Sequence, residues 1–432
     1  MITSMAQPTA RVPTLTDPVA PQERIPVIDI LRGWAIFGIL LVNMTNDLPW
    51  EHLISRQWTG TADRLVYHLV EIFAQEKFYS LFSFLFGLGF ALQMGRAERR
   101  GAPFDRLYLR RLLGLYLIGL TQILLVGDGT LRIYALLAVL LLLLRHCSPR
   151  TILLLAVLCV LILPVRAAVN SGIREVRLAN PHTAREVLRE KAQEAVEERQ
   201  WQEEDTRVHS SGSFVETVAW HAPRILRPHL SFPWVVTPWW LGMEFPLMLL
   251  GLYAGRRHIF ENLPAHLPLL RKVMWWGLGL GLLGCSVHHG LNQFKDAALP
   301  YPTHELTGLL WAFGAPALSF SYASAIVLLV QRDRWRLRLA PLAAVGRLAL
   351  SNYVLHWLIA MFLFYAYGAG LYGRFGPLVG FGLALLIFPL QVALSMWWVT
   401  RFRFGPAEWL WRTLTYGKLQ PMRVQQAVIA KA

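Results

Sequence analysis

Long apolar runs recur along this chain of 432 residues, each roughly the 20 residues that an α-helix needs to cross a bilayer. Hydrophobic residues make up 55% of the chain and charged residues only 16%, a balance typical of integral membrane proteins. The runs are continuous and Leu-rich, whereas the strands of a membrane barrel alternate over short segments. The sequence therefore predicts an all-α, polytopic integral membrane protein.

The apolar pattern predicts about ten transmembrane helices. Their expected ranges are 26–46, 66–94, 107–126, 131–145, 150–168, 238–255, 270–288, 307–330, 341–366 and 376–400. Short loops rich in Lys and Arg stay in the cytoplasm. One set of alternate loops carries sixteen such residues, whereas the opposite short loops carry five. Both termini are therefore predicted to be cytoplasmic.

The spans divide the chain into five segments. Residues 1–25 are polar and Pro-rich, which predicts a disordered cytoplasmic tail rather than a cleaved signal. Residues 26–168 hold the first five spans, and residues 169–237 form an outer-side loop whose charge spacing predicts an amphipathic helix. Residues 238–400 hold the last five spans. The alternation of Trp and cationic residues in 401–432 predicts a helix that lies on the cytoplasmic face, followed by a tail.

The formal net charge of +15 is spread over cytoplasmic loop ends, which favours contact with anionic lipids over nucleic-acid binding. The three cysteines have neither paired nor metal-ligand spacing, so we expect no disulfide and no metal. His288 and His289 point to different helix faces and do not form a chelating pair. No phosphate-binding loop, serine-hydrolase elbow or zinc-protease pattern occurs in a suitable context.

An acid and a base lie at the cytoplasmic mouth of the first span, in RIPVIDILRGWAIFGILLVN. Asp29 and Arg32 are three residues apart, so they share one helix face. Charges in a membrane are costly and usually mark functional sites. The alternative is that Asp29 helps to start the helix and Arg32 reaches lipid headgroups.

Two polar groups lie towards the outer side. After the first span come Asn43, His52 and Asp63, and a His flanked by carboxylates can act as a general base or can be an ordinary loop histidine. Glu76 and Lys77 precede a Gly- and Phe-rich span. They either neutralise each other or hold a polar ligand.

Two further groups lie in or beside the spans. Asp128 stands between two glycines in the hairpin after the third span, shortly before Tyr134, although Gly-Asp-Gly is also an ordinary turn signal. Asn352 and His356 lie four apart on one helix face, where they could bind a ligand or simply join helices. We also expect close helix approach at a run of glycines, namely Gly277, Gly279, Gly281 and Gly284.

Several stretches closely resemble the YeiB-like family, whose C-terminal half is domain of unknown function 418. They are VIDILRGWAIFGILLVN, EKFYSLFSFLFGLGFALQM, the Gly-Asp hairpin with YAL, and GRLALSNYVLHWLI with RFRFGPAEWLWRTLTYGKLQP. Two positions depart from the family pattern. Tyr134 follows Asp128 by six residues where the family has five, and His356 stands where Gln is more usual.

The first-span pattern is also similar to the wider transmembrane acyltransferase group, which includes the lysosomal heparan-α-glucosaminide acetyltransferase. In that enzyme the corresponding span leads to an Asn, a catalytic His and an Asp, and Asn43, His52 and Asp63 follow here in similar order. The resemblance implies a membrane acyltransferase of the bacterial cytoplasmic (inner) membrane. It would move an acyl group from a cytosolic thioester, with acyl-CoA as co-substrate, to an extracytoplasmic or membrane-embedded hydroxyl or amine.

In that scheme His52 removes the acceptor proton, Asp63 orients the imidazole, and Asn43 donates to the developing oxyanion. Donor and substrate contacts would come from eight residues: Asp29, Arg32, Glu76, Lys77, Asp128, Tyr134, Asn352 and His356.

The expected partners are membrane lipids and a glycan, lipid or small-metabolite acceptor, without metal or nucleic acid, and a homo-oligomer is compatible with the sequence. A transporter of a lipid or small metabolite, which would use the same buried charges, is the alternative hypothesis. A non-enzymatic scaffold or sensor is a third.

Overall fold

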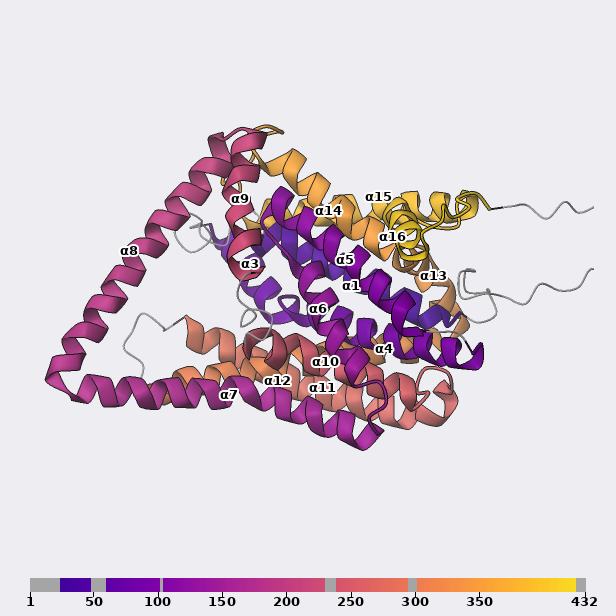
Figure 1. The fold of residues 1–432 in the computed structure, drawn as a ribbon, viewed down its shortest axis with the longest axis horizontal. Coiled ribbons are helices and arrows are strands. Elements are labelled where there is room, and N and C mark those ends of the chain that lie inside the picture. The colour runs from indigo at the N-terminus through magenta and orange to yellow at the C-terminus, as the bar shows by residue number, and fades with distance from the viewer. Residues whose placement is uncertain (1–23, 48–59, 102–103, 230–237, 294–300, 425–432) are drawn as a thin grey trace, which may run out of the picture.

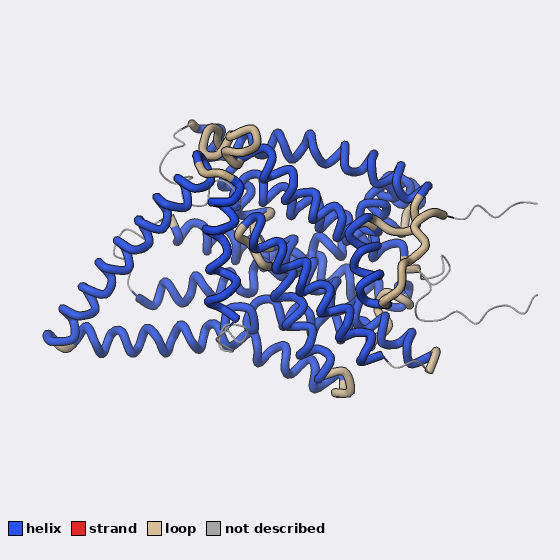
Figure 2. Tube along the Cα trace, turned by 45° about the horizontal axis from the view of Figure 1, so that its top comes forward, coloured by secondary structure: helices blue, strands red, loops and turns tan. Residues whose placement is uncertain are grey.

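A computed structural model describes residues 24–47, 60–101, 104–229, 238–293 and 301–424 (Figure 1). These residues are helical almost throughout, and no strand occurs among them (Figure 2). A single isolated bridge pairs Phe402 with Arg423 in the part of the chain described. The predicted all-α class is confirmed. The predicted tail lies almost wholly outside the described residues.

Each predicted span coincides with one or two helices. The N-terminal half contains α1 (Pro26–Val42), the π-helical turn η2 (Asn43–Asp47), α3 (Thr61–Phe73), α4 (Lys77–Arg99), α5 (Phe104–Val126), α6 (Thr130–Leu143) and α7 (Pro149–Ala179). After α8 (Pro181–Ser211) and α9 (Phe214–His229), the C-terminal half contains α10 (Pro238–Arg256), α11 (Leu263–Asn292), α12 (Tyr301–Val330), α13 (Asp333–Arg347), α14 (Ala349–Phe364), α15 (Pro377–Arg401) and α16 (Pro406–Tyr416).

Fewer than ten of the described helices are long enough and apolar enough to cross a membrane. Six of the described helical segments are long and apolar enough, or seven if α13 and α14 count as one span. One of the six is the whole segment Thr61–Arg99, and α6 is a shorter apolar helix. The chain is therefore a multi-pass membrane protein by length and composition, with six or seven supported spans where the apolar pattern predicted about ten.

Two of the expected helices are interrupted, a difference from the predicted ranges 66–94 and 341–366. A turn separates α3 from α4, and α13 and α14 meet at Leu348 with a bend of 75°. Backbone groups freed at such breaks must find partners within the protein. Lys77 Nζ donates to Glu71 O at 2.8 Å, and Asn352 Nδ2 donates to Leu348 O at 3.1 Å. Polar side chains therefore stabilise both breaks.

The helix α1 runs through the centre of the bundle and crosses α13 at two glycines. A Cβ atom at Gly33 would overlap the carbonyl oxygen of Leu342, and one at Gly346 would overlap that of Asp29. Small residues allow such close contact between membrane helices. The crossing holds Asp29 and Arg347 close to one another at the same end of the bundle.

The predicted glycine run on α11 is largely confirmed as a contact with α12. Cβ atoms at Gly277, Gly281 and Gly284 would each press on the α12 backbone. Gly279 faces open space instead. The pair therefore packs through one glycine face of α11, as helical spacing requires.

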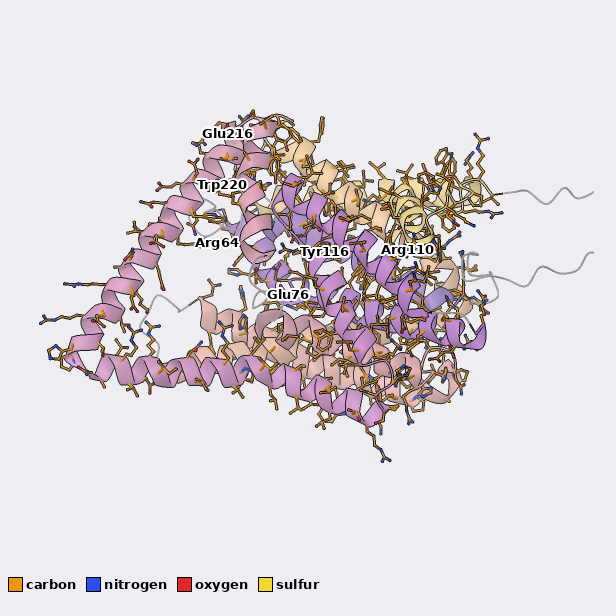
Figure 3. The ribbon with its side chains drawn as sticks, viewed as in Figure 1. Arg64, Glu76, Arg110, Tyr116, Glu216 and Trp220 are labelled. Atoms are coloured by element: carbon orange, nitrogen blue, oxygen red, sulfur yellow. The ribbon has the colours of Figure 1, made fainter. Side chains whose placement is uncertain are left out.

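An arm made of α7, α8 and α9 extends from the body on the side away from the described chain ends (Figure 1). Figure 3 shows Glu216 and Trp220 on α9, which faces the end of α8. Arg207 on α8 pairs with Glu216 at 2.7 Å, and Trp220 Nε1 donates to Asp205 Oδ1 at 2.9 Å. His221 on α9 lies 3.1 Å from the carbonyl oxygen of Leu124, which fixes the arm to the end of α5.

Candidate functional site

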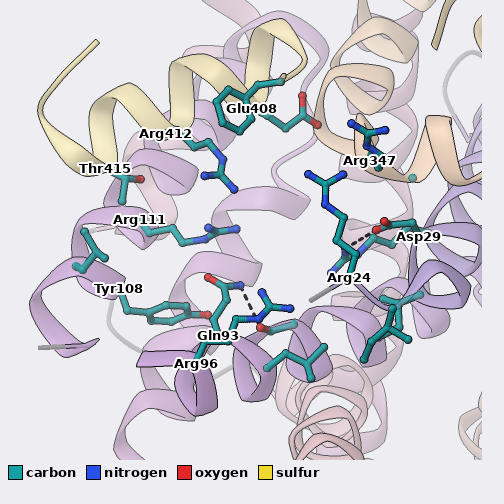
Figure 4. A pocket seen from close by; sticks show the side chains of 18 of the residues that line it. Arg24, Asp29, Gln93, Arg96, Tyr108, Arg111, Arg347, Glu408, Arg412 and Thr415 are labelled. Atoms are coloured by element: carbon teal, nitrogen blue, oxygen red, sulfur yellow. Dashed lines mark hydrogen bonds and ion pairs between the residues drawn. The ribbon is translucent and has the colours of Figure 1, made fainter. Parts of the chain in front are cut away.

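A pocket rich in arginine opens where the described start of the chain meets its C-terminal helix. It has a volume of about 270 Å³. Two carboxyl groups, Asp29 and Glu408, lie in its wall. Eight arginines surround them: Arg24, Arg32, Arg96, Arg100, Arg111, Arg347, Arg403 and Arg412. Figure 4 shows Arg111 and Arg412 pointing into this space from one side, with Arg24 and Arg347 across from them.

Each carboxyl group at the pocket is already engaged within the protein. Asp29 Oδ1 accepts a hydrogen bond of 3.1 Å from Arg32 Nη1, so the predicted pair forms. Glu408 Oε1 accepts from the backbone N–H groups of Leu350 and Ser351 at 2.8 and 3.1 Å. Glu408 thereby provides the acceptor that the N–H groups in the first turn of α14 lack within the helix. The pocket retains a large excess of positive charge.

The helix α16 carries part of this charge and is fixed to α5. Trp411 Nε1 donates to the carbonyl oxygen of Arg111 at 2.6 Å, and the Arg111 guanidinium lies 3.9 Å from the centre of the Trp411 ring. Burial raises the pKa of Glu408 and lowers the pKa of Arg412, whose pKa the neighbouring Arg24 lowers further. An anion in the pocket would offset the cost of burying these arginines.

The pocket continues inward as a second cavity of about 240 Å³. The two share Arg32, Arg111 and Arg347 among their lining residues. The inner wall is apolar and includes Phe82, Leu85, Phe86, Leu115 and Leu131. The arrangement is thus a charged vestibule that leads into an apolar chamber, which suits a ligand with a polyanionic head and a less polar arm.

Two tyrosines line the inner end of this chamber, and each has a buried carboxyl neighbour. The hydroxyl of Tyr134 lies 3.4 Å from Glu244 Oε2, and the hydroxyl of Tyr353 lies 3.4 Å from Asp128 Oδ2. Asp128 also accepts from Gln122 Nε2 at 2.6 Å. The two predicted residues Asp128 and Tyr134 therefore lie at or beside the cavity.

The predicted outer residues connect to the cavity less directly. Asn43 is buried in η2, and its Oδ1 accepts from the hydroxyl of Tyr79 at 3.0 Å, while the backbone oxygen of Tyr79 lies 3.4 Å from the hydroxyl of Tyr134. Asp63 Oδ1 accepts from Leu378 N at 3.0 Å, at the start of α15. His52 lies outside the described residues.

The remaining predicted residues lie away from the two cavities. Glu76 has a φ of 65° at the turn before α4, and Lys77 is buried there. Asn352 donates to Ser395 Oγ at 3.1 Å, and His356 Nε2 lies 3.2 Å from Gln391 Oε1. Both bonds join α14 to α15, which corresponds to the helix-joining alternative of the sequence analysis. Neither residue lines the described cavities.

Several residues that line the cavities carry little signal in the local sequence. In the sequence, Arg111 is one of the many cations that mark cytoplasmic loop ends, Tyr353 stands within GRLALSNYVLHWLI, and Arg412 lies in the predicted interfacial helix. Glu244 offered the clearest missed signal, since it is the lone acid in the run 238–255, and a carboxyl within an apolar span is functional by default.

Proteins of known sequence are similar to this chain over nearly its whole length. YxaH of Bacillus subtilis is 32% identical over 426 residues, covering 95% of this chain and 97% of its own length. Residues 254–418 match the family described as protein of unknown function DUF418. The chain belongs to the DUF418 family. YeiB of Escherichia coli, 28% identical over 91% of the DUF418 chain and 96% of its own length, is a further relative.

A second family matches the N-terminal part of this DUF418 protein. Residues 24–181 match the catalytic region described as heparan-alpha-glucosaminide N-acetyltransferase. That range includes Asp29, Arg32, Arg111 and Tyr134, while Arg347 and Arg412 come from the DUF418 region. The arginine pocket is thus built jointly by both matched regions. No solved structure is significantly similar to the DUF418 chain.

Proposed function

We propose that this protein is a membrane acyltransferase that takes an acyl group from a cytosolic acyl-CoA. The observation that carries the proposal is the pocket of eight arginines continuing into an apolar chamber. Arginines bind phosphate groups through charge-assisted hydrogen bonds, and the chamber fits the pantetheine arm with the thioester at its inner end. The similarity of residues 24–181 to an acetyltransferase catalytic region supports the same reaction class.

The acceptor is a hydroxyl or amine on a glycan, lipid or small metabolite, reached from within the membrane or from its outer side. In this reaction His52 is the base that removes the proton of the acceptor hydroxyl or amine. Asp63 orients the His52 imidazole, and Asn43 donates a hydrogen bond to the developing oxyanion. The hydrogen bond between Asn43 and Tyr79 supports this assignment, because Tyr79 also lies beside Tyr134 at the cavity end. The bacterial relatives support the cytoplasmic membrane as the site of action.

Binding of CoA to the purified protein in detergent tests the donor site directly. We expect saturable binding that weakens as salt rises, because the contacts are ionic. Arg412→Gln should weaken binding by about tenfold or more, as expected for loss of a charge-assisted contact. Arg334→Gln, which alters an exposed arginine of α13 outside the pocket, should leave the affinity unchanged.

Pantetheine, which lacks the phosphates, should bind much more weakly than CoA and should not respond to Arg412→Gln. Absence of saturable CoA binding to the wild type would overturn the proposal. If the same preparation moved a lipid or metabolite across liposomes, the transporter hypothesis would replace it.

A further inference from the structure

A short chain of hydroxyl groups leads from the inner end of the cavity to a buried carboxyl group. The hydroxyl of Tyr134 lies 2.6 Å from Ser83 Oγ, and Ser83 Oγ is hydrogen-bonded to Oε2 of Glu244. The three residues come from α6, α4 and α10. Exposed fractions are 1% for Tyr134, 0% for Ser83 and 5% for Glu244, so three helices hold the chain away from water.

The partners of Glu244 distinguish it from the other acids around the cavity. Within the described part of the chain its carboxyl group contacts only the hydroxyls of Ser83 and Tyr134, with no cation and no backbone N–H group. A buried carboxylate without a cation is costly, whereas a neutral acid can donate its own proton. A neutral Glu244 donates to Ser83, and Ser83 Oγ then donates to the Tyr134 hydroxyl at 2.6 Å in preference to the backbone oxygen of Tyr79 at 3.0 Å. Among the described residues, the acceptor left for the Tyr134 proton is that same Tyr79 oxygen at a long 3.4 Å, so a better placed acceptor in the cavity can take its place.

The hydroxyl of Tyr353, at the same end of the cavity, is engaged differently. It accepts from Gln122 Nε2 at 3.0 Å and lies 3.4 Å from Asp128 Oδ2, to which it donates. Asp128 also accepts from the backbone N–H and the hydroxyl of Thr130 at 3.2 and 3.0 Å. This network closes the turn between α5 and α6. Both tyrosine hydroxyls thus have an acceptor within the protein at 3.4 Å, a carboxyl oxygen for Tyr353 and a backbone oxygen for Tyr134. A hydrogen bond to a carboxylate is the stronger of the two, so Tyr353 is the matched control for Tyr134.

We propose that the Tyr134 hydroxyl donates a hydrogen bond to the carbonyl oxygen of the acyl thioester, with Ser83 and Glu244 as positioning residues that direct its proton into the cavity. The inference rests on the proposed acyl transfer. The acceptor oxygen or nitrogen bonds to the carbonyl carbon, the carbonyl oxygen carries the negative charge, and the C–S bond then breaks with its electron pair leaving on sulfur. The acceptor proton passes to the base and finally to the thiolate. Tyr134 stabilises the charge on the carbonyl oxygen.

The first experiment compares binding of acetyl-CoA and CoA, since only acetyl-CoA offers the thioester carbonyl. Tyr134→Phe should weaken acetyl-CoA binding by about three- to tenfold, the range for loss of one hydrogen bond, and leave CoA binding unchanged. Retained CoA binding also shows that the variant is folded. Tyr353→Phe should leave the ratio of the two affinities at the wild-type value.

The second experiment tests the positioning role. Glu244→Gln keeps an N–H donor towards Ser83 and should preserve the affinity ratio, whereas Glu244→Ala should lower it as Tyr134→Phe does. The infrared carbonyl stretch of bound, ¹³C-labelled acetyl-CoA should shift to lower frequency in the wild type and Glu244→Gln, and the shift should vanish in Tyr134→Phe.

The outcomes separate the two proposals. If the wild type binds neither CoA nor acetyl-CoA, the proposed function fails. If CoA binds but Tyr134→Phe keeps the wild-type affinity ratio and carbonyl frequency, only the role of Tyr134 is overturned. If Glu244→Gln behaves as Glu244→Ala, the positioning role of Glu244 as a donor is wrong.

Discussion

A single side chain, Glu408, connects the C-terminal helix to the bend between α13 and α14. Its two oxygens accept hydrogen bonds from the backbone N–H groups of Leu350 and Ser351 and from the Ser351 hydroxyl. These N–H groups belong to the first turn of α14 and have no partner within the helix. Glu408 therefore acts as a remote N-terminal cap, and it holds α16 with its Arg412 beside the pocket.

Glu408→Ala should lower the free energy of unfolding by about 2 kcal/mol, because buried N–H groups lose their acceptor. Unfolding by SDS titration of the purified protein measures the loss. Glu408→Gln keeps one amide oxygen for the backbone and should lose less. Glu204→Ala, which removes an exposed ion pair on α8, should change stability by less than about 0.5 kcal/mol. Equal losses for Glu408→Ala and Glu408→Gln would contradict the capping role.

The sequence predicted some residues of the site because their spacing was local. Asp29 and Arg32 share a helix face at a separation of three, and they form the expected ion pair. The arginine pocket could not be predicted, since Arg24, Arg111 and Arg412 meet only through tertiary packing. Glu244 could have been noticed as a lone acid in an apolar span, but its hydroxyl partners lie on other helices.

Among the helix contacts, the crossing of α1 and α13 positions part of the pocket wall. Gly33 and Gly346 allow the two backbones to touch, and Gly346 and Arg347 also line the pocket. Apolar composition predicted a single helix over 341–366 and not the break at Leu348, because Gly346 and Arg347 interrupt the apolar run only briefly. The break depends on partners distant in sequence, such as Glu408, which local patterns do not contain.

Gly346→Ala should push α13 away from α1 and destabilise the protein by about 1–3 kcal/mol, the usual cost of overpacking. CoA affinity should also fall, because Arg32 and Arg347 lie on either side of this contact. Gly279→Ala is the matched control, since a Cβ atom there meets no neighbour within 4 Å. It should be neutral or slightly stabilising. A Gly346→Ala protein with wild-type stability and CoA affinity would show that the crossing tolerates a methyl group.

For the whole molecule, the described ends of the chain lie on one side and the α7–α9 arm on the other (Figure 1). Arg24 and Arg412 line the same pocket, so the start of α1 and the helix α16 share that side. The distribution of cations predicts that this side is cytoplasmic. A cytosolic donor would then enter the arginine pocket without crossing the membrane.

Reporter fusions test this orientation. A fluorescent protein fused after residue 424 should fluoresce, and alkaline phosphatase inserted at Gln193 on α8 should be active, because it requires the outer compartment. Gln193 lies in the exposed part of α8, so the insertion should not disturb the body. The reverse pattern would place the arginine pocket outside the cell and remove its access to cytosolic thioesters.

The arginine pocket also has a consequence for how the protein is made. Its wall takes Arg24 from just before α1, Arg403 from the turn between α15 and α16, and Arg412 from α16. A nascent or truncated chain that has inserted the helices before α15 still lacks one wall of this pocket. Under the proposed function, such a chain would bind acyl-CoA only once α16 has been made and has packed against α5.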